Sequence, residues 1–119
     1  MYLNNSKIIV IKIGSSLLID DKRKIRNKWL YEFSKDIKNL LSKNKKIIIV
    51  SSGAIAMGCK KLNLSKKNLK LEKSQAVASV GQIQLMNLFN KNFFKNKINI
   101  SQILLTLEDT EQRRRALNA

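Results

Sequence analysis

The sequence predicts an α/β fold built on a mostly parallel sheet, and three features of the chain lead to this prediction. Two short runs, residues 8–13 and 47–50, are almost continuously aliphatic, which is typical of strands buried on both faces inside a parallel sheet. A stretch with helical periodicity separates the two runs, and a longer helical stretch follows the second. Strand, helix and strand in this order form a βαβ unit, whose crossover should be right-handed.

The first expected strand, residues 8–13, contains a single charged residue, Lys12. Burying a lysine among aliphatic side chains is costly unless it meets a negative charge. The strand ends at Gly14, and Ser15 and Ser16 complete a turn rich in hydrogen-bond donors. Because ligands bind at the carboxyl ends of strands in open α/β sheets, we hypothesise that Lys12 and this turn hold phosphate. The pattern matches neither a P-loop nor a dinucleotide fingerprint, and a lysine that only reaches solvent is the alternative.

A helix is predicted over residues 26–42. Its apolar side chains, among them Trp29, Phe33 and Ile37, recur at helical spacing, and charged residues occupy the other faces. We interpret the two aromatic residues as part of the core rather than as groups that stack on a ligand. The charged stretch 20–24 before this helix fits either a loop over the site or a solvated connection.

A second candidate turn follows the run 47–50. It consists of Ser51, Ser52 and Gly53, and a helix begins at Ala54. Hydroxyl groups, backbone amides and the positive end of a helix dipole together suit a carboxylate or a phosphate. Simple N-capping by one of the serines is the alternative interpretation. The βαβ unit places this turn at the same sheet edge as the turn after the first strand.

The sequence after the second turn predicts two further helices and a third strand. A long helix is expected over residues 72–95, and Gly81 in its middle, which costs up to about 1 kcal/mol relative to alanine, indicates close approach by another backbone. Residues 98–106 are predicted as a third strand, and residues 112–119 as a helix that Thr110 caps. Three parallel strands with two free edges make a poor finished fold, so we expect the N-terminal piece of a larger α/β domain.

Lysine dominates the charge of this chain. The 24 Lys and Arg residues against 8 Asp and Glu give a formal net charge of +16. The lysines are scattered through every segment, and we interpret them as a solvated coat that reflects AT-rich codon usage. A small basic nucleic-acid-binding module is the alternative from another functional class, although no concentrated basic face supports it.

The sequence argues against several other kinds of site. With one cysteine, Cys59, and no histidine, a zinc site is excluded, and Cys59 has no neighbouring base that would make it a nucleophile. Arg113, Arg114 and Arg115 fit a solvated helix face better than a phosphate clamp. No apolar run is long enough to cross a membrane and no signal peptide is recognisable, so we expect a cytoplasmic protein.

Five blocks of sequence follow one another in a characteristic order and spacing between residues 8 and 119. They are V-I-K-I-G-S-S-L-L, I-V-S-S-G-A-I-A-M-G, Q-A-V-A-S-V-G-Q, I-L-L-T-L-E-D and R-R-A-L-N-A. These blocks resemble the glutamate 5-kinase branch of the amino acid kinase family. The blocks V-S-S-G-A-I-A and V-G-Q are specific to that branch, whereas K-I-G-S-S would also fit family members that phosphorylate aspartate, acetylglutamate or UMP. Another member of the family therefore stays as an alternative.

The resemblance implies a three-layer αβα sandwich around a mostly parallel sheet, incomplete in this chain. Residues 1–119 would be the N-terminal, acceptor-substrate half of the kinase domain, without the nucleotide-binding half. The implied activity transfers the γ-phosphoryl group of ATP, with Mg²⁺, to the γ-carboxylate of L-glutamate, the first step of proline biosynthesis. The product, glutamyl 5-phosphate, would pass to glutamyl phosphate reductase. The resemblance also implies a homo-oligomer at full length, with no membrane and no specific nucleic acid as partner.

The resemblance also assigns residues on the ATP side of the site. Lys12 matches the family lysine that contacts the ATP phosphates, which makes it the candidate catalytic residue. Gly14 and Ser15 match the phosphate-binding turn. No residue of the chain is assigned to a metal. The ATP-adenine residues of the family lie beyond residue 119, so we expect the 119 residues alone to be inactive.

On the acceptor side, Ser52 matches the serine that binds glutamate, and Gly53 and Ala54 supply the backbone beside it. The sequence departs from the family pattern at two places. Cys59 stands where a basic residue is usual, and Ser74 stands where a lysine often precedes the glutamine of the long helix. Neither position belongs to the assigned site, so the departures bear on fine substrate preference and oligomer contacts.

Overall fold

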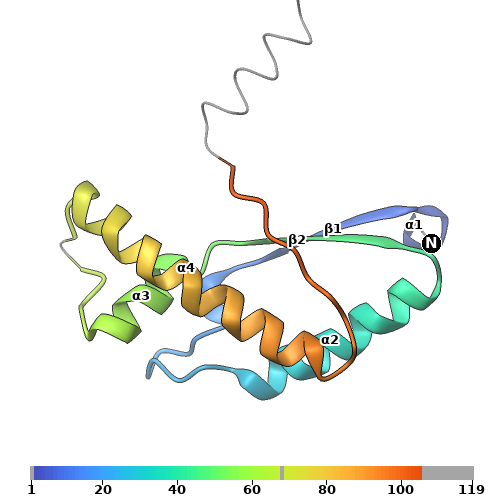
Figure 1. The fold of residues 1–119 in the computed structure, drawn as a ribbon, viewed down its shortest axis with the longest axis horizontal. Coiled ribbons are helices and arrows are strands. Elements are labelled where there is room, and N and C mark those ends of the chain that lie inside the picture. The colour runs from blue at the N-terminus through green and yellow to red at the C-terminus, as the bar shows by residue number, and fades with distance from the viewer. Residues whose placement is uncertain (1, 68, 106–119) are drawn as a thin grey trace, which may run out of the picture.

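The structure, a computed structural model, describes residues 2–67 and 69–105. Within these ranges, two strands form a small parallel sheet and several helices pack beside it (Figure 1). In chain order the elements are α1 (Tyr2–Asn5), β1 (Ile8–Ile13), the 3₁₀ turn η1 (Ser15–Leu17), α2 (Asn27–Ser42), β2 (Lys46–Ser51), α3 (Ala54–Leu62) and α4 (Leu71–Phe94).

The two strands lie parallel, as the sequence predicts. Ile8 pairs with Lys46 at one end of the ladder, and Ile13 pairs with Ser51 at the other. Helix α2 makes the connection between the strands, so the expected βαβ unit is confirmed. Because both strands end at the same edge, the segments that follow them begin side by side.

Asparagine residues end two of the helices. Asn44 follows α2 with a φ of 60°, and Asn63 follows α3 with a φ of 53° and a ψ of 46°. Asparagine tolerates this left-handed conformation better than most residues, and it commonly ends a helix in this way. The turn at Asn44 leads directly into β2, and the turn at Asn63 leads into the connection toward α4.

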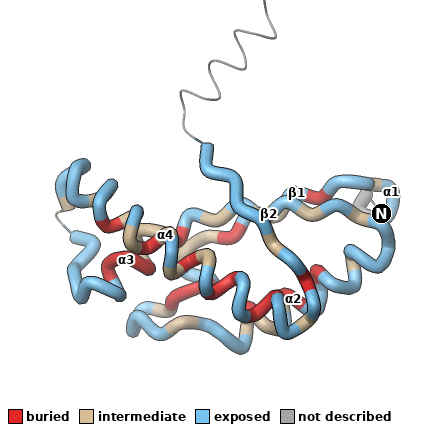
Figure 2. The backbone as a smooth tube through the Cα atoms, viewed as in Figure 1, coloured by how far each residue is buried: buried red, intermediate tan, exposed pale blue. Residues whose placement is uncertain are grey.

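The core lies between one face of the sheet and the helices α2, α3 and α4. Figure 2 shows buried segments on all three helices. Trp29 stacks on Phe33 with ring centroids 5.3 Å apart, and Phe33 in turn meets Phe93 of α4. Trp29 and Phe33 both pack against the core, which agrees with their interpretation as structural residues. The other main core residues are Ile13, Leu18, Leu30, Ile37, Met57, Leu85, Leu88 and Phe89.

The opposite face of the sheet is open in the described part of the chain. Val10 is 61% exposed and Ile48 is 52% exposed, and Ile8 and Val50 share this face. The expectation of strands buried on both faces is therefore wrong for these residues. Successive side chains of a strand point to opposite faces, and the described helices cover only the face of Ile9 and its alternate neighbours.

The predicted third strand is also wrong over residues 98–105. This segment forms no strand, although Ile98 is buried and Ile100 packs against the core. A strand requires a hydrogen-bonded neighbour, and no ladder joins this segment to β1 or β2. Ile103 is 81% exposed, so the apolar pattern that suggested a strand is not buried here. Thr106, the predicted helix 112–119 with its cap at Thr110, and Arg113–115 lie outside the described residues.

A small polar cluster joins α2 to α4 inside the core. Ser34 is fully buried, and its Oγ donates to the carbonyl of Tyr31 at 2.6 Å. The same oxygen accepts a hydrogen bond from Nδ2 of Asn96, also at 2.6 Å. Asn92, which is 1% exposed, donates from its Nδ2 to the carbonyl of Leu88 at 3.0 Å.

No described helix, α4 included, is both long and apolar enough to cross a membrane.

Candidate active site

The two candidate turns meet at the carboxyl edge of the sheet. Ile13 and Ser51 are register partners, so Gly14 and Ser52 are the next residues on two neighbouring strands. The predicted juxtaposition of the turns is therefore confirmed by the pairing of β1 with β2. Of the assigned residues, Lys12, Gly14 and Ser15 lie on one strand end and Ser52, Gly53 and Ala54 lie on the other.

The turn after β1 is a short 3₁₀ turn with open surroundings. Gly14 has an extended backbone, with φ of −74° and ψ of 159°, and its carbonyl accepts from the amide of Leu17 at 3.2 Å. A Cβ atom placed on Gly14 would meet no heavy atom of the described chain within 4 Å. Neither backbone strain nor crowding therefore requires glycine here. The backbone at this position is accessible, as a phosphate-binding turn needs.

Lys12 projects from the open face of the sheet. It pairs in register with Val50, and it is exposed. Within the described ranges, the Lys12 side chain takes part in neither a hydrogen bond nor an ion pair. The ammonium group thus has no structural partner there. Lys12 precedes Gly14, whose backbone is accessible, by two residues in the sequence.

The turn after β2 leaves the N-terminus of α3 without a side-chain cap. Gly53, which has no side chain, is the N-cap residue, and no side-chain cap bond is formed at this end of the helix within the described part of the chain. Ser51 Oγ is buried without a partner among the described residues, while Ser52 is exposed. The alternative interpretation, N-capping by one of these serines, is therefore wrong. The first amides of a helix are unsatisfied donors, so this end of α3 suits an anion.

The two turns are also in direct contact. A Cβ atom on Gly53 would lie 3.0 Å from Cδ1 of Leu18 and 3.4 Å from Cδ1 of Leu85. Leu18 directly follows the 3₁₀ turn and is 1% exposed. Its side chain therefore reaches from the first turn to the base of the second, and Leu85 supports the same spot from α4.

The charged stretch 20–24 forms a tight hairpin that sequence reasoning left undecided. Asp20 Oδ1 accepts from the amides of Lys22 and Lys24 at 2.9 and 2.8 Å. Lys60 Nζ donates to the carbonyl of Arg23 at 2.7 Å, and Arg23 reaches the carbonyl of Leu64. These contacts fasten the hairpin to the carboxyl end of α3, not to its N-terminus. The stretch is therefore a connection tied to α3 rather than a loop over the site.

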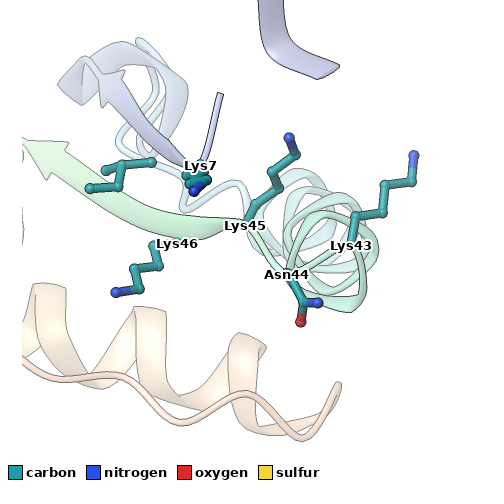
Figure 3. Close-up of a pocket in the computed structure, with 6 residues that line it drawn as sticks. Lys7, Lys43, Asn44, Lys45 and Lys46 are labelled. Carbon is teal, nitrogen blue, oxygen red and sulfur yellow. The ribbon is translucent and has the colours of Figure 1, made fainter. Parts of the chain in front are cut away.

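A basic hollow lies at the opposite, amino end of the strands (Figure 3). It is lined by Lys7, Ile8, Lys43, Asn44, Lys45 and Lys46. Lys45 Nζ donates to the carbonyls of Asn4 and Ser6 at 2.8 and 2.5 Å, so it holds the N-terminal segment in place. The register puts Lys46 at the far end of the ladder from Ser51, so the hollow is not part of the candidate site.

Comparison with known proteins identifies the family of this chain. The model of the amino acid kinase family matches residues 7–119. This chain belongs to the amino acid kinase family. Membership confirms the predicted α/β class with a parallel sheet, of which the described residues form one part.

Several curated relatives that match this chain are named glutamate 5-kinase. A protein named glutamate 5-kinase from Pelagibacter ubique (strain HTCC1062) is 81% identical over 119 residues, which is 100% of this chain and 32% of the relative. A glutamate 5-kinase from Nitrobacter hamburgensis is 48% identical over 120 residues, 100% of this chain and 32% of the relative. A third from Bartonella henselae is 50% identical over 113 residues, 95% of this chain and 30% of the relative. The chain spans about a third of the length of these relatives.

Proposed function

We propose that residues 1–119 are the acceptor-substrate half of a glutamate 5-kinase domain, whose nucleotide-binding half this chain does not contain. The enzyme would transfer the γ-phosphoryl group of ATP to the γ-carboxylate of L-glutamate, giving glutamyl 5-phosphate for proline biosynthesis. The observation that carries this proposal is the 81% identity along the whole chain to a relative named glutamate 5-kinase.

Lys12 is the proposed catalytic residue. Proteins catalyse phosphoryl transfer mainly by positioning the groups and by stabilising the charge that develops on the transferring phosphoryl group. The ammonium of Lys12, which has no partner among the described residues, and the accessible backbone at Gly14 support this role, and Ser15 would add a further donor to the phosphates. In the reaction, a γ-carboxylate oxygen of glutamate forms a bond to the γ-phosphorus, and the bond from that phosphorus to the β–γ bridging oxygen breaks. ADP leaves with the electron pair of the broken bond.

The acceptor would bind at the uncapped end of α3. Ser52 offers an exposed hydroxyl, and Gly53 and Ala54 offer backbone beside it. A carboxylate at this position would receive hydrogen bonds from these donors and interact favourably with the positive end of the helix. The pairing of Ile13 with Ser51 supports a short distance between this carboxylate and the phosphates at the neighbouring strand end.

The proposal also covers the metal ion, the cellular compartment and the protein partners. ATP would be used together with Mg²⁺. Mg²⁺ is usually bound through substrate phosphates, waters and only one or two carboxylates. In the described ranges, no three or more His, Cys, Asp or Glu residues gather into a group that could hold a metal ion. We also propose a cytoplasmic homo-oligomer that passes its product to glutamyl phosphate reductase.

The test uses a chimeric kinase, in which this chain replaces the matching segment of the Pelagibacter ubique relative. Acyl phosphates react with hydroxylamine, so glutamyl phosphate can be measured as its hydroxamate. We expect ATP-dependent hydroxamate with L-glutamate and none with L-aspartate or N-acetyl-L-glutamate. Phosphorylation of UMP gives no acyl phosphate, so for UMP the release of ADP is measured, and we expect none above background. A folded chimeric kinase that ignores glutamate, or prefers another acceptor, would overturn the proposal. The 119-residue chain alone should give no more product than its Lys12→Ala variant.

A further inference from the structure

Helices α3 and α4 cross with their backbones in contact (Figure 1). A Cβ atom on Gly81 of α4 would lie 1.7 Å from the carbonyl oxygen of Ala54 and 2.5 Å from the amide nitrogen of Gly58. The close approach that the sequence predicted at Gly81 is confirmed. The atoms in the way belong to backbone, so a side chain at this position would have to move α3 itself.

The contact is reciprocal along the two helices. A Cβ atom on Gly58 of α3 would lie 2.1 Å from the carbonyl oxygen of Val77. Val77, Gly81 and Leu85 are spaced by four residues, so they lie on one face of α4, and all three are buried. Along this face, Val77 meets Gly58, Gly81 meets Ala54, and Leu85 approaches Gly53.

This face of α4 therefore ends under the proposed acceptor site. Gly53 and Ala54 are the backbone that would receive the glutamate carboxylate, and each touches α4. Side chains that cap α3 from its own turn are absent among the described residues. The position of the first turn of α3 thus depends on contact with α4 rather than on local capping.

We propose that Gly81 is a positioning residue for the acceptor: it sets the place of the first turn of α3, and through it the place of the bound carboxylate. The inference rests on the proposed function and deepens it. A displacement of about 1 Å at a binding group can lower a rate by about 100-fold. The three heavy atoms nearest to a Cβ atom on Gly81 all belong to α3 and none to the turn that follows β1, so the KM for ATP should change less than the KM for glutamate.

The test compares variants of the chimeric kinase. We expect Gly81→Ala and Gly58→Ala to raise the KM for L-glutamate at least tenfold while the KM for ATP stays within twofold. The control is Leu88→Ala, which removes a buried side chain of α4 that belongs to the same core. It should lower thermal stability and leave both KM values within twofold. Equal changes in the two KM values, or none in a folded Gly81→Ala variant, would overturn the inference.

A milder variant covers the case in which neither glycine variant folds. Val77→Ala shortens the side chain that packs on Gly58 and introduces no clash. It should raise the KM for glutamate at least threefold and leave the KM for ATP unchanged, and a folded variant without this difference would contradict the inference. The unsubstituted chimeric kinase separates the two proposals. If it does not phosphorylate glutamate, the proposed function fails, whereas activity without the expected KM difference removes only the role of Gly81.

Discussion

Arg26 donates a hydrogen bond from its Nε to the backbone carbonyl of Ser16, over 3.1 Å. The backbone amide of Arg26 also donates to the carbonyl of Leu18 at 2.8 Å. Arg26 immediately precedes α2, so these two bonds tie the start of that helix to the turn after β1. The turn proposed to hold the ATP phosphates is thus anchored from outside its own sequence.

Replacing Arg26 should loosen this turn. Arg26→Gln removes the bond to Ser16, and an exposed hydrogen bond of this kind contributes about 0.5–1.5 kcal/mol. We expect the KM for ATP of the chimeric kinase to rise about threefold to tenfold, while the KM for glutamate stays constant. Lys28→Gln is the matched control, because Lys28 is an exposed cation nearby that makes no ion pair within the described chain. A rise in the KM for glutamate alone would contradict this role of Arg26.

Lys12 should matter for catalysis and not for folding. Lys12→Met removes a cation that is exposed and has no partner in the described ranges, so the melting temperature should change little. Loss of one preorganised charge-stabilising group typically lowers kcat by about 100- to 1,000-fold, and we expect that range.

Lys46→Met provides the control for this experiment. Lys46 is exposed on β2 but lies at the amino end of the ladder, opposite Ile8 and away from the turns. Its replacement removes the same charge from the same sheet and should leave kcat within twofold. Equal losses of kcat in the Lys12 and Lys46 variants would point to overall charge and would argue against a specific role of Lys12.

The adjacent serines 51 and 52 should behave differently. Ser52→Ala removes the exposed hydroxyl proposed to bind glutamate, so the KM for glutamate should rise about tenfold. Ser51→Ala removes a buried hydroxyl that has no partner among the described residues. An unsatisfied buried polar group is unfavourable by about 1–3 kcal/mol, so this variant should keep its KM and melt at the same or a higher temperature. The reverse pattern, with Ser51→Ala impaired in glutamate binding, would transfer the acceptor contact to Ser51.

Local sequence patterns predicted that the two turns of the candidate site lie side by side, because this follows from the direction of the two strands. The aliphatic runs gave β1 at its observed bounds, and the βαβ order alone places both strand ends at one edge. Contacts between residues far apart in the chain, in contrast, leave no recognisable pattern in the sequence. Lys60 and Arg23 meet across 37 positions, and nothing in the sequence around either residue indicates the other.

One prediction and one alternative interpretation that the structure contradicts have the same origin, because both rest on local composition alone. Residues 98–105 carry the apolar composition of a strand, but composition does not say whether a neighbouring strand is there to pair with. The Ser51-Ser52-Gly53 turn carries the composition of an N-cap, yet neither serine caps α3. In both places the residues have the composition that favours the expected structure, but the neighbouring residues in the fold do not provide the contacts that this structure needs.

Two serines of α2 provide a test of the polar cluster inside the core. Ser34 and Ser42 both donate from Oγ to the carbonyl three residues earlier, each at 2.6 Å. Ser34 is fully buried and also accepts from Asn96, whereas Ser42 is exposed. Ser34→Ala leaves the Asn96 amide without this partner, which should cost about 1–3 kcal/mol. Ser42→Ala should cost less than about 0.5 kcal/mol, as surface substitutions usually do.

Thermal unfolding of the chimeric kinase measures this difference. We expect a clearly lower melting temperature for Ser34→Ala and almost no change for Ser42→Ala, with the KM values for both substrates unchanged. The double variant Ser34→Ala with Asn96→Ala should melt close to Ser34→Ala alone, because the second change removes the group that the first leaves unpaired. Additive losses in the double variant would show that the two side chains act independently, and equal losses for the two serines would show that the bond to Asn96 contributes nothing.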